Sequence, residues 1–187
     1  MREIEIKARV RDIATLHKRL QKAGVVLSKP RTQRDVVYAM PDWETRASDD
    51  RIWLRVRDDS QTGLTFTLKK PLTNKHDNIE HEVIISDAQE MEAALQLMGF
   101  VHFVTVVKTR QKGTLGDIEI CVDHLEGVGS FIEVETLLSD PKASYKTESV
   151  KLWKVLEQLG VTPEDQELRG YDVIVRQRAG QHVPVTF

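Results

Sequence analysis

Residues 2–7 read Arg2-Glu3-Ile4-Glu5-Ile6-Lys7, and in this stretch charged and apolar side chains alternate one by one. Because successive side chains of a strand point to opposite faces, the alternation predicts a β-strand with a charged face and an apolar face. From Asp12 to Gly24 the apolar residues recur at helical spacing instead, with Asp12 placed to cap the first turn and Gly24 placed to end the last. The start of the chain therefore predicts a strand followed by an amphipathic helix.

The same two patterns continue along the chain. Further stretches have the composition of strands and are separated by turn sequences: residues 36–38, 52–57, 64–69, 79–85, 101–111, 117–122 and 130–138. Helical spacing returns over residues 87–99 and 146–160, and Thr162-Pro163 starts a further helical turn. No internal repeat and no low-complexity segment divides the sequence, so we expect one domain over residues 1–175, followed by a loose tail over 176–187.

The polar faces of these strands carry an unusual pattern of charge. Several strands place charged residues two positions apart, and so on one face: Glu3/Glu5/Lys7, Arg55/Arg57, Glu80/Glu82, Lys108/Arg110, Asp117/Glu119 and Glu133/Glu135. An open sheet with one face in water explains any single pair. The joint occurrence favours a closed barrel, because about eight antiparallel strands can close around a lumen that the charged faces line. We therefore expect an α+β fold, an eight-stranded antiparallel closed β-barrel with the amphipathic helices packed on its outside.

A lumen lined by both signs of charge indicates the chemistry of its ligand. Arginine and lysine bind phosphate oxygens, arginine through its two-pronged guanidinium and lysine as a point charge. Clustered carboxylates hold Mg²⁺ or Mn²⁺, which prefer oxygen ligands and bridge phosphate groups. The pattern therefore predicts a site for a polyanion together with a divalent cation.

Composition excludes several classes of protein. Lys and Arg number 27 against 29 Asp and Glu in 187 residues, and this balance gives no global attraction to nucleic acid or to an anionic membrane. Cys121 is the one cysteine, so no intramolecular disulfide can form, and the N-terminus lacks the apolar run of a signal peptide. No stretch approaches the ~18 apolar residues of a membrane-spanning helix. We expect a cytoplasmic protein with neither a nucleic-acid partner nor a membrane partner.

The first strand, Glu3-Ile4-Glu5-Ile6-Lys7, resembles the ExExK signature of the CYTH superfamily, also called triphosphate tunnel metalloenzymes. Further motifs follow in the same order: Arg34-Asp35-Val36-Val37-Tyr38, Trp53-Leu54-Arg55-Val56-Arg57, Thr67-Leu68-Lys69-Lys70-Pro71, Glu80-His81-Glu82, Val107-Lys108-Thr109-Arg110 and residues 122–135. The last of these, followed by Arg169-Gly170-Tyr171, is most similar to the CyaB-type branch, the class IV adenylyl cyclases and their relatives.

The resemblance implies an eight-stranded antiparallel tunnel that acts on a triphosphate with Mg²⁺ or Mn²⁺. Carboxylates of the metal site would be Glu3, Glu5, Glu133 and Glu135, with Glu80, Glu82, Glu119 and Asp123 as further acidic lining. The triphosphate would be bound by Lys7, Arg55, Arg57, Lys69, Lys108 and Arg110. The catalytic group would comprise Glu5, Lys69 and Lys108.

The cyclase branch implies a lyase that converts ATP to cyclic AMP and pyrophosphate, with the ribose 3′-hydroxyl aimed at the α-phosphorus. The alternative is a hydrolase of inorganic triphosphate, thiamine triphosphate or a nucleoside triphosphate, with water aimed at the γ-phosphorus. Val37 argues against hydrolysis, because hydrolytic relatives carry there a tyrosine implicated in activating water. Lys70 replaces the usual glycine of the family and adds a cation either at a tunnel mouth or in solvent. A non-catalytic protein that binds polyphosphate or a phosphorylated signal is the third option.

Other residues that could carry chemistry are assigned to structure. The six histidines lack metal-ligand spacing, and Cys121 lies in an apolar strand, where a buried structural thiol is typical. Trp43, Trp53 and Trp153 could each stack on adenine. Trp153 belongs to the apolar stripe of a helix and is assigned to the core, Trp53 falls in the apolar Trp53–Val56 region, and Trp43 stays open. Apolar outer faces of the strands are compatible with a homodimer.

Overall fold

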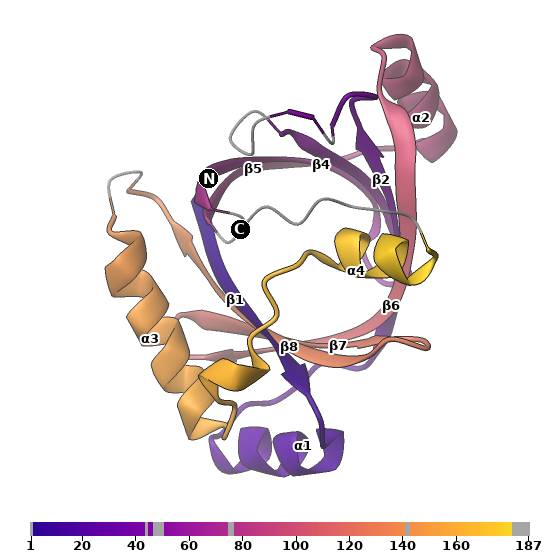
Figure 1. Cartoon of the computed structure of the whole chain (residues 1–187). Helices are drawn as coiled ribbons and strands as arrows, with labels where there is room; N and C mark the ends of the chain where they lie inside the picture. The colour runs from indigo at the N-terminus through magenta and orange to yellow at the C-terminus, as the bar shows by residue number, and fades with distance from the viewer. Residues whose placement is uncertain (1, 44, 47–50, 75–76, 141–142, 181–187) are drawn as a thin grey trace. The chain divides into compact units, whose positions relative to one another are not determined.

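The computed structural model describes residues 2–43, 45–46, 51–74, 77–140 and 143–180 (Figure 1). Its elements are β1 (Arg2–Val10), α1 (Ile13–Lys22), β2 (Arg31–Ala39), β3 (Trp53–Asp59), β4 (Gly63–Asn74), β5 (Asp77–Ile84), α2 (Ala88–Leu97), β6 (Val101–Leu115), β7 (Ile118–Leu125), β8 (Gly129–Leu138), α3 (Tyr145–Gln158), the 3₁₀ helix η2 (Pro163–Asp165) and α4 (Tyr171–Arg178). His76, His182 and the tail beyond residue 180 lie outside the described residues. Within those ranges, no helix is long and apolar enough to cross a membrane.

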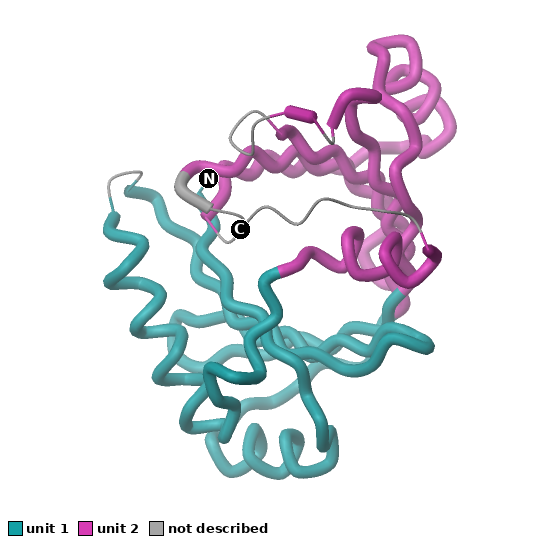
Figure 2. Tube along the Cα trace, in the orientation of Figure 1, with its two compact units in different colours: residues 1–31, 108–168 teal, residues 32–107, 169–187 magenta. Residues whose placement is uncertain are grey.

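The eight strands form one closed antiparallel barrel in the order β1-β5-β4-β3-β2-β6-β7-β8. The predicted α+β barrel is therefore confirmed. The chain divides into two compact units (Figure 2): unit 1 comprises residues 1–31 and 108–168, and unit 2 comprises residues 32–107 and 169–187.

Unit 1 has its apolar core between one face of the sheet and two helices. Alternate residues of β1, β7 and β8 point into this core, which α1 and α3 cover (Figure 1). Its fully or nearly fully buried members include Ile4, Ile6, Ile120, Ile132, Val134, Leu20, Leu152 and Leu156. Helix α1 begins where the carboxylate of Asp12 accepts a hydrogen bond from the Thr15 backbone N–H at 3.0 Å, as the capping pattern predicts. Because one face of the sheet is used for this core, the charged residues of the same strands share the other face.

Unit 2 repeats this arrangement on a smaller scale. The apolar sides of β2 and β3 pack on α2, with Val36, Tyr38, Leu54, Val56 and Leu95 buried. Asp87 caps α2 and accepts hydrogen bonds from the backbone N–H groups of the first turn. The alternate residues of β3 and β4 are again left for a charged surface.

The structure differs from the sequence-based expectation in two places. Residues 171–178 form α4, whose two turns are too short for a helical period to be recognised in the sequence. This helix continues past residue 176, where a loose tail was expected. Trp53 was expected on the apolar side of β3, but it alternates with Arg55 and Arg57 and therefore lies on their face. The apolar character of a tryptophan outweighed its position in that prediction.

Candidate active site

Carboxylates from three strands meet on the charged face of unit 1. The register pairs Glu5 of β1 with Glu135 of β8, and Glu135 with Glu119 of β7, so the three carboxylates form one row across the sheet. Glu3 lies two residues before Glu5, and one oxygen from each of Glu3, Glu5 and Glu135 lies within 4.8 Å of the others. Like charges placed directly opposite each other destabilise a sheet. We call Glu3, Glu5, Glu119 and Glu135 the acidic cluster. Their carboxylates offer oxygen ligands of the kind that Mg²⁺ and Mn²⁺ prefer.

Crowding of negative charge appears in the pKa values of the acidic cluster. Burial and the neighbouring charge of Glu119 raise the pKa of Glu135 to about 7. Burial would also raise the pKa of Glu119, but the hydrogen bond and charge of Lys112, together with hydrogen bonds to Glu135 and Cys121, outweigh burial and lower that pKa. The cluster therefore retains a proton near neutral pH when it has no cation, and a divalent cation would displace this proton. On this test the residues fit a divalent metal.

Beside the acidic cluster, the same face carries a buried network of ion pairs. Lys108 Nζ lies 3.2 Å from Oδ2 of Asp123, and Arg110 Nε donates to Oδ1 of the same carboxylate at 2.6 Å. Arg110 also donates to Glu133, whose other oxygen lies 3.8 Å from Lys7 Nζ. All five of these residues are buried, and each is at most 6% exposed. Burial opposes the charge of Arg110, but Asp123 and its other anionic neighbours hold its pKa well above the ordinary value.

The expected metal ligands fall into two groups in the structure. Three of the four lie in the acidic cluster: Glu3, Glu5 and Glu135. Glu133, the fourth, lies two residues along β8 and pairs with the cations of the network. Glu119 was expected only as acidic lining, yet the register places it directly opposite Glu135. The two-residue period shows that these side chains share a face, whereas their partners depend on register.

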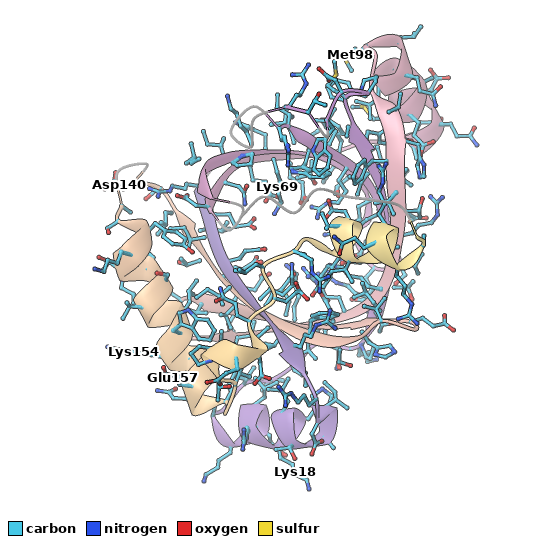
Figure 3. The ribbon with its side chains drawn as sticks, in the orientation of Figure 1. Lys18, Lys69, Met98, Asp140, Lys154 and Glu157 are labelled. Carbon is cyan, nitrogen blue, oxygen red and sulfur yellow. The ribbon has the colours of Figure 1, made fainter. Side chains whose placement is uncertain are left out.

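Unit 2 carries a second charged surface, on β3, β4 and β5. Lys69, labelled in Figure 3, lies with its Nζ 2.7 Å from Glu80 Oε2. Arg55 donates to Thr67 Oγ1 at 2.9 Å and lies 3.4 Å from Glu82, while the Thr67 hydroxyl donates to Glu82 at 3.0 Å. Thr67 was missed in the sequence, although it alternates with Lys69 on β4. The structure thus brings four of the expected tunnel residues together in this unit.

Arg57, the remaining expected cation of unit 2, has a carboxylate partner of its own. Asp35 on β2 accepts hydrogen bonds from Arg57 Nε at 2.6 Å and from Nη2 at 2.7 Å. Both residues are buried. Arg55 differs, since its Nε has no hydrogen-bond partner among the described residues. Arg55 is therefore the arginine of this surface with a donor to spare for a phosphate oxygen.

The two departures from the family pattern have clear positions. Val37 lies opposite Arg55 in the β2–β3 register and is 7% exposed, whereas Tyr38 belongs to the apolar core. Position 37 therefore brings an isopropyl group, not a hydroxyl, to the charged surface. Lys70 is exposed and lies on the opposite side of β4 from Lys69, which places it in solvent.

Cys121 is fully buried but does not lie in apolar surroundings. It alternates with Glu119 and Asp123 along β7, and its Sγ donates to Glu119 Oε1 at 3.5 Å. Burial raises the pKa of the thiol far above its ordinary value. Because the thiolate is the nucleophilic form, Cys121 remains unreactive, in agreement with its assignment to structure.

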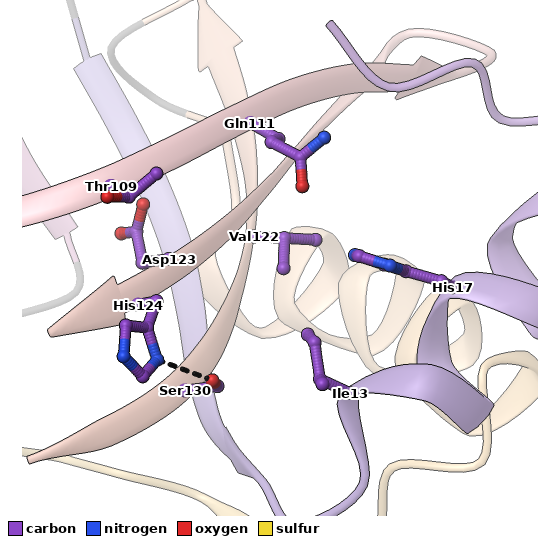
Figure 4. Close-up of a pocket in the computed structure, with 8 residues that line it drawn as sticks. All are labelled: Ile13, His17, Thr109, Gln111, Val122, Asp123, His124 and Ser130. Atoms are coloured by element: carbon purple, nitrogen blue, oxygen red, sulfur yellow. Dashed lines mark hydrogen bonds between the residues drawn. The ribbon is translucent and has the colours of Figure 1, made fainter. Parts of the chain in front are cut away.

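A pocket of about 210 Å³ lies in unit 1 on the side of the sheet that faces α1 (Figure 4). Its lining comprises Ile13, His17, Thr109, Gln111, Val122, Asp123, His124 and Ser130. A hydrogen bond of 3.0 Å joins His124 Nδ1 and Ser130 Oγ. Among the residues that the structure describes, no lysine or arginine lines the pocket, and the carboxylate of Asp123 is used by the ion-pair network. The pocket therefore lacks the cations that a polyanion requires.

Comparison with known proteins gives consistent matches over nearly the whole chain. The profile of the CYTH domain family matches residues 1–171. A Methanocaldococcus jannaschii protein named as a candidate adenylate cyclase is 28% identical over 173 residues, which are 91% of this chain and 97% of that protein. Adenylate cyclase CyaB of Aeromonas hydrophila is 23% identical over 176 residues, or 94% of this chain and 89% of its own. The solved structure of PH1819 from Pyrococcus horikoshii OT3 superimposes with a TM-score of 0.78 at 26% identity, covering 94% of this chain and 99% of that one.

Proposed function

The chain belongs to the CYTH domain family, and from this premise we propose that it is a metal-dependent adenylyl cyclase that converts ATP to cyclic AMP and pyrophosphate. One observation carries the proposal. A single face of unit 1 combines the acidic cluster with a buried network of lysine and arginine side chains paired with carboxylates. Phosphoryl chemistry depends mostly on positioning and on neutralising charge, and these two features supply both.

The buried cations are the groups that would bind the phosphate oxygens. Lys7, Lys108 and Arg110 are held by Glu133 and Asp123, so their ammonium and guanidinium groups are fixed before a ligand arrives. Fixed donors need no reorganisation when charge develops in the transition state. Unit 2, taken by itself, offers Arg55 and Lys69 as proposed phosphate ligands.

The acidic cluster is the proposed metal site. Glu3, Glu5 and Glu135 would hold Mg²⁺ or Mn²⁺, and a bound divalent cation would neutralise phosphate charge and lower the pKa of the attacking hydroxyl. In the cyclisation, the ribose 3′-oxygen bonds to the α-phosphorus, the bond from that phosphorus to the bridging oxygen breaks, and pyrophosphate leaves. The hydroxyl proton passes to a carboxylate oxygen of the cluster, for which Glu5 is the assigned residue. Lys108 and Arg110 stabilise the charge on the leaving pyrophosphate.

Two findings favour cyclisation over hydrolysis. Position 37 brings no hydroxyl to the charged surface of unit 2, so the tyrosine implicated in hydrolytic relatives has no counterpart there. Both curated relatives described above carry adenylate cyclase names, although at 28% and 23% identity. The competing proposal is a triphosphatase, in which the same charges would direct water to the terminal phosphorus.

Product analysis tests the proposal directly. Purified protein is incubated with ATP and Mg²⁺ or Mn²⁺, and cyclic AMP, ADP, pyrophosphate and phosphate are resolved, with inorganic triphosphate in a parallel incubation. Glu5→Gln should abolish metal-dependent formation of cyclic AMP, whereas Glu157→Gln, at an exposed glutamate of α3, should match the wild type. Phosphate released from inorganic triphosphate would select the triphosphatase, and binding without turnover would select the non-catalytic protein.

A further inference from the structure

Lys112 brings a further cation of β6 to the charged face of unit 1. It stands two residues after Arg110 and therefore lies on the same face of the strand. Its Nζ donates a hydrogen bond to Glu119 Oε1, and both side chains are only partly buried. The cations of the buried network pair instead with Glu133 and Asp123. Lys112 thus places an ammonium group on the acidic cluster itself.

The ligand atoms around the acidic cluster fall into two adjoining groups that share one carboxylate. Oxygens of Glu3, Glu5 and Glu135 lie within 4.8 Å of one another, and so do the ligand atoms of Glu119, Cys121 and Glu135. We call these groups the first and the second cation position. Many enzymes that act on phosphates fill two such neighbouring positions with divalent ions about 3.5–4 Å apart. Glu135 is placed to serve both positions.

The second cation position already holds a positive charge. The Glu119 oxygen that accepts from Lys112 also accepts from Cys121 Sγ, at 3.5 Å. The register pairs Lys112 with Cys121 and Glu119 with Glu135, so all four residues come from the neighbouring strands β6, β7 and β8 (Figure 1). Because the ammonium group is tethered to the chain, its effective concentration at this position is high. Coulomb repulsion from it opposes the entry of a divalent ion beside Glu119.

From this geometry we propose that Lys112 takes the second cation position, so that the protein binds a single divalent ion, through Glu3, Glu5 and Glu135. The inference rests on the proposed function for the metal site and adds the number of ions that the site accepts. A divalent ion can lower the pKa of a hydroxyl bound to it, whereas an ammonium group supplies a point charge alone. Lys112 therefore contributes charge toward a phosphate in place of a second metal ion.

Counting bound Mn²⁺ in the absence of ATP tests this inference. Free Mn²⁺ is measured by its electron paramagnetic resonance signal while wild type, Lys112→Met and Lys112→Gln are titrated at pH 8. The wild type should bind one ion per chain. Both variants should bind two, with the first bound about 10- to 100-fold more tightly, the range by which groups next to metal ligands alter affinity. Lys112→Gln keeps an N–H donor for Glu119, so it serves as the test if Lys112→Met does not fold.

Two controls separate the charge of Lys112 from the loss of any paired lysine. Lys112→Arg keeps a cation beside Glu119 and should still bind one ion. Lys151→Met removes a lysine that lies 2.9 Å from Glu148 on α3, and it should also bind one ion.

The count of ions separates the inference from the proposed function. Two ions on the wild type, or the wild-type count and affinity in both neutral variants, would overturn the inference and leave the proposed function standing. A wild type that binds no Mn²⁺ would overturn the metal site of the proposed function, and the inference with it.

Discussion

Replacing Glu135 with glutamine should raise the free energy of unfolding of the metal-free protein and reduce the stabilisation that a bound metal ion provides. The pKa of Glu135 is raised from 4.5 to about 7 by burial and by Glu119. Between these two values the folded protein binds a proton that the unfolded chain releases, so the free energy of unfolding falls as pH rises from 4.5 to 7 and stays low above pH 7. The difference corresponds to roughly 3 kcal/mol.

Glutamine carries no charge at any of these pH values, so Glu135→Gln lacks this loss of stability. In EDTA at pH 8 the variant should be more stable than the wild type by up to about 3 kcal/mol, and its stability should vary less between pH 4.5 and 7. Millimolar Mg²⁺ or Mn²⁺ should reverse the order, because a cation stabilises a folded protein by about 2.7 kcal/mol at one hundred times its dissociation constant, and the variant has lost one ligand.

Urea unfolding measured by circular dichroism is the assay, with EDTA or metal at pH 4.5, 6, 7 and 8. For a urea dependence of about 1–3 kcal/mol per molar, the predicted difference moves the midpoint by about 1 M or more. Glu157→Gln is the control, since this exposed residue of α3 lies outside the acidic cluster. A Glu135→Gln protein no more stable than the wild type in EDTA at pH 8 would refute the crowding of charge in the cluster.

Three further predictions follow from particular residues. Lys108→Ala should raise the KM for ATP about tenfold or more through the loss of one charged hydrogen bond, whereas Lys70→Ala, at the exposed lysine, should leave the KM unchanged. Steady-state kinetics distinguish the two variants, and equal effects on KM would remove Lys108 from the site. Val37→Tyr should increase phosphate release from inorganic triphosphate, measured colorimetrically, and unchanged release would withdraw the argument from position 37 against hydrolysis. Gly113→Ala should lower the free energy of unfolding by about 1–3 kcal/mol, because the added Cβ would lie 2.7 Å from Val25 Cγ1; an unchanged urea midpoint would show that the segment at Val25 moves aside at no cost.

Much of the fold follows from local patterns. The alternation in residues 2–7 predicts both the first strand and its two faces, and those faces are the core and the charged surface of unit 1. Asp12 and Asp87 cap α1 and α2 as their positions before apolar stripes predict. Helix α4 was missed because eight residues give no clear periodicity.

The arrangement of the candidate site was predicted less completely than the fold. Glu119, Glu133 and Glu135 all fit the alternation, but only the pairing of β7 with β8 shows that Glu119 lies directly opposite Glu135. Trp53 could have been placed correctly, since it stands two residues before Arg55, but its apolar character was given more weight than its position.

By itself, the sequence determined which side chains share a face of each strand and where three of the four described α-helices lie, and it predicted the charge chemistry of the ligand. Tertiary structure alone decided which charges become partners, which cation keeps a spare donor, and how far the pKa of Glu135 is raised. The physical reason is that the two-residue period of a strand is a local property of the backbone. Register and burial depend instead on segments far apart in the chain, and the energy of a buried charge depends on both.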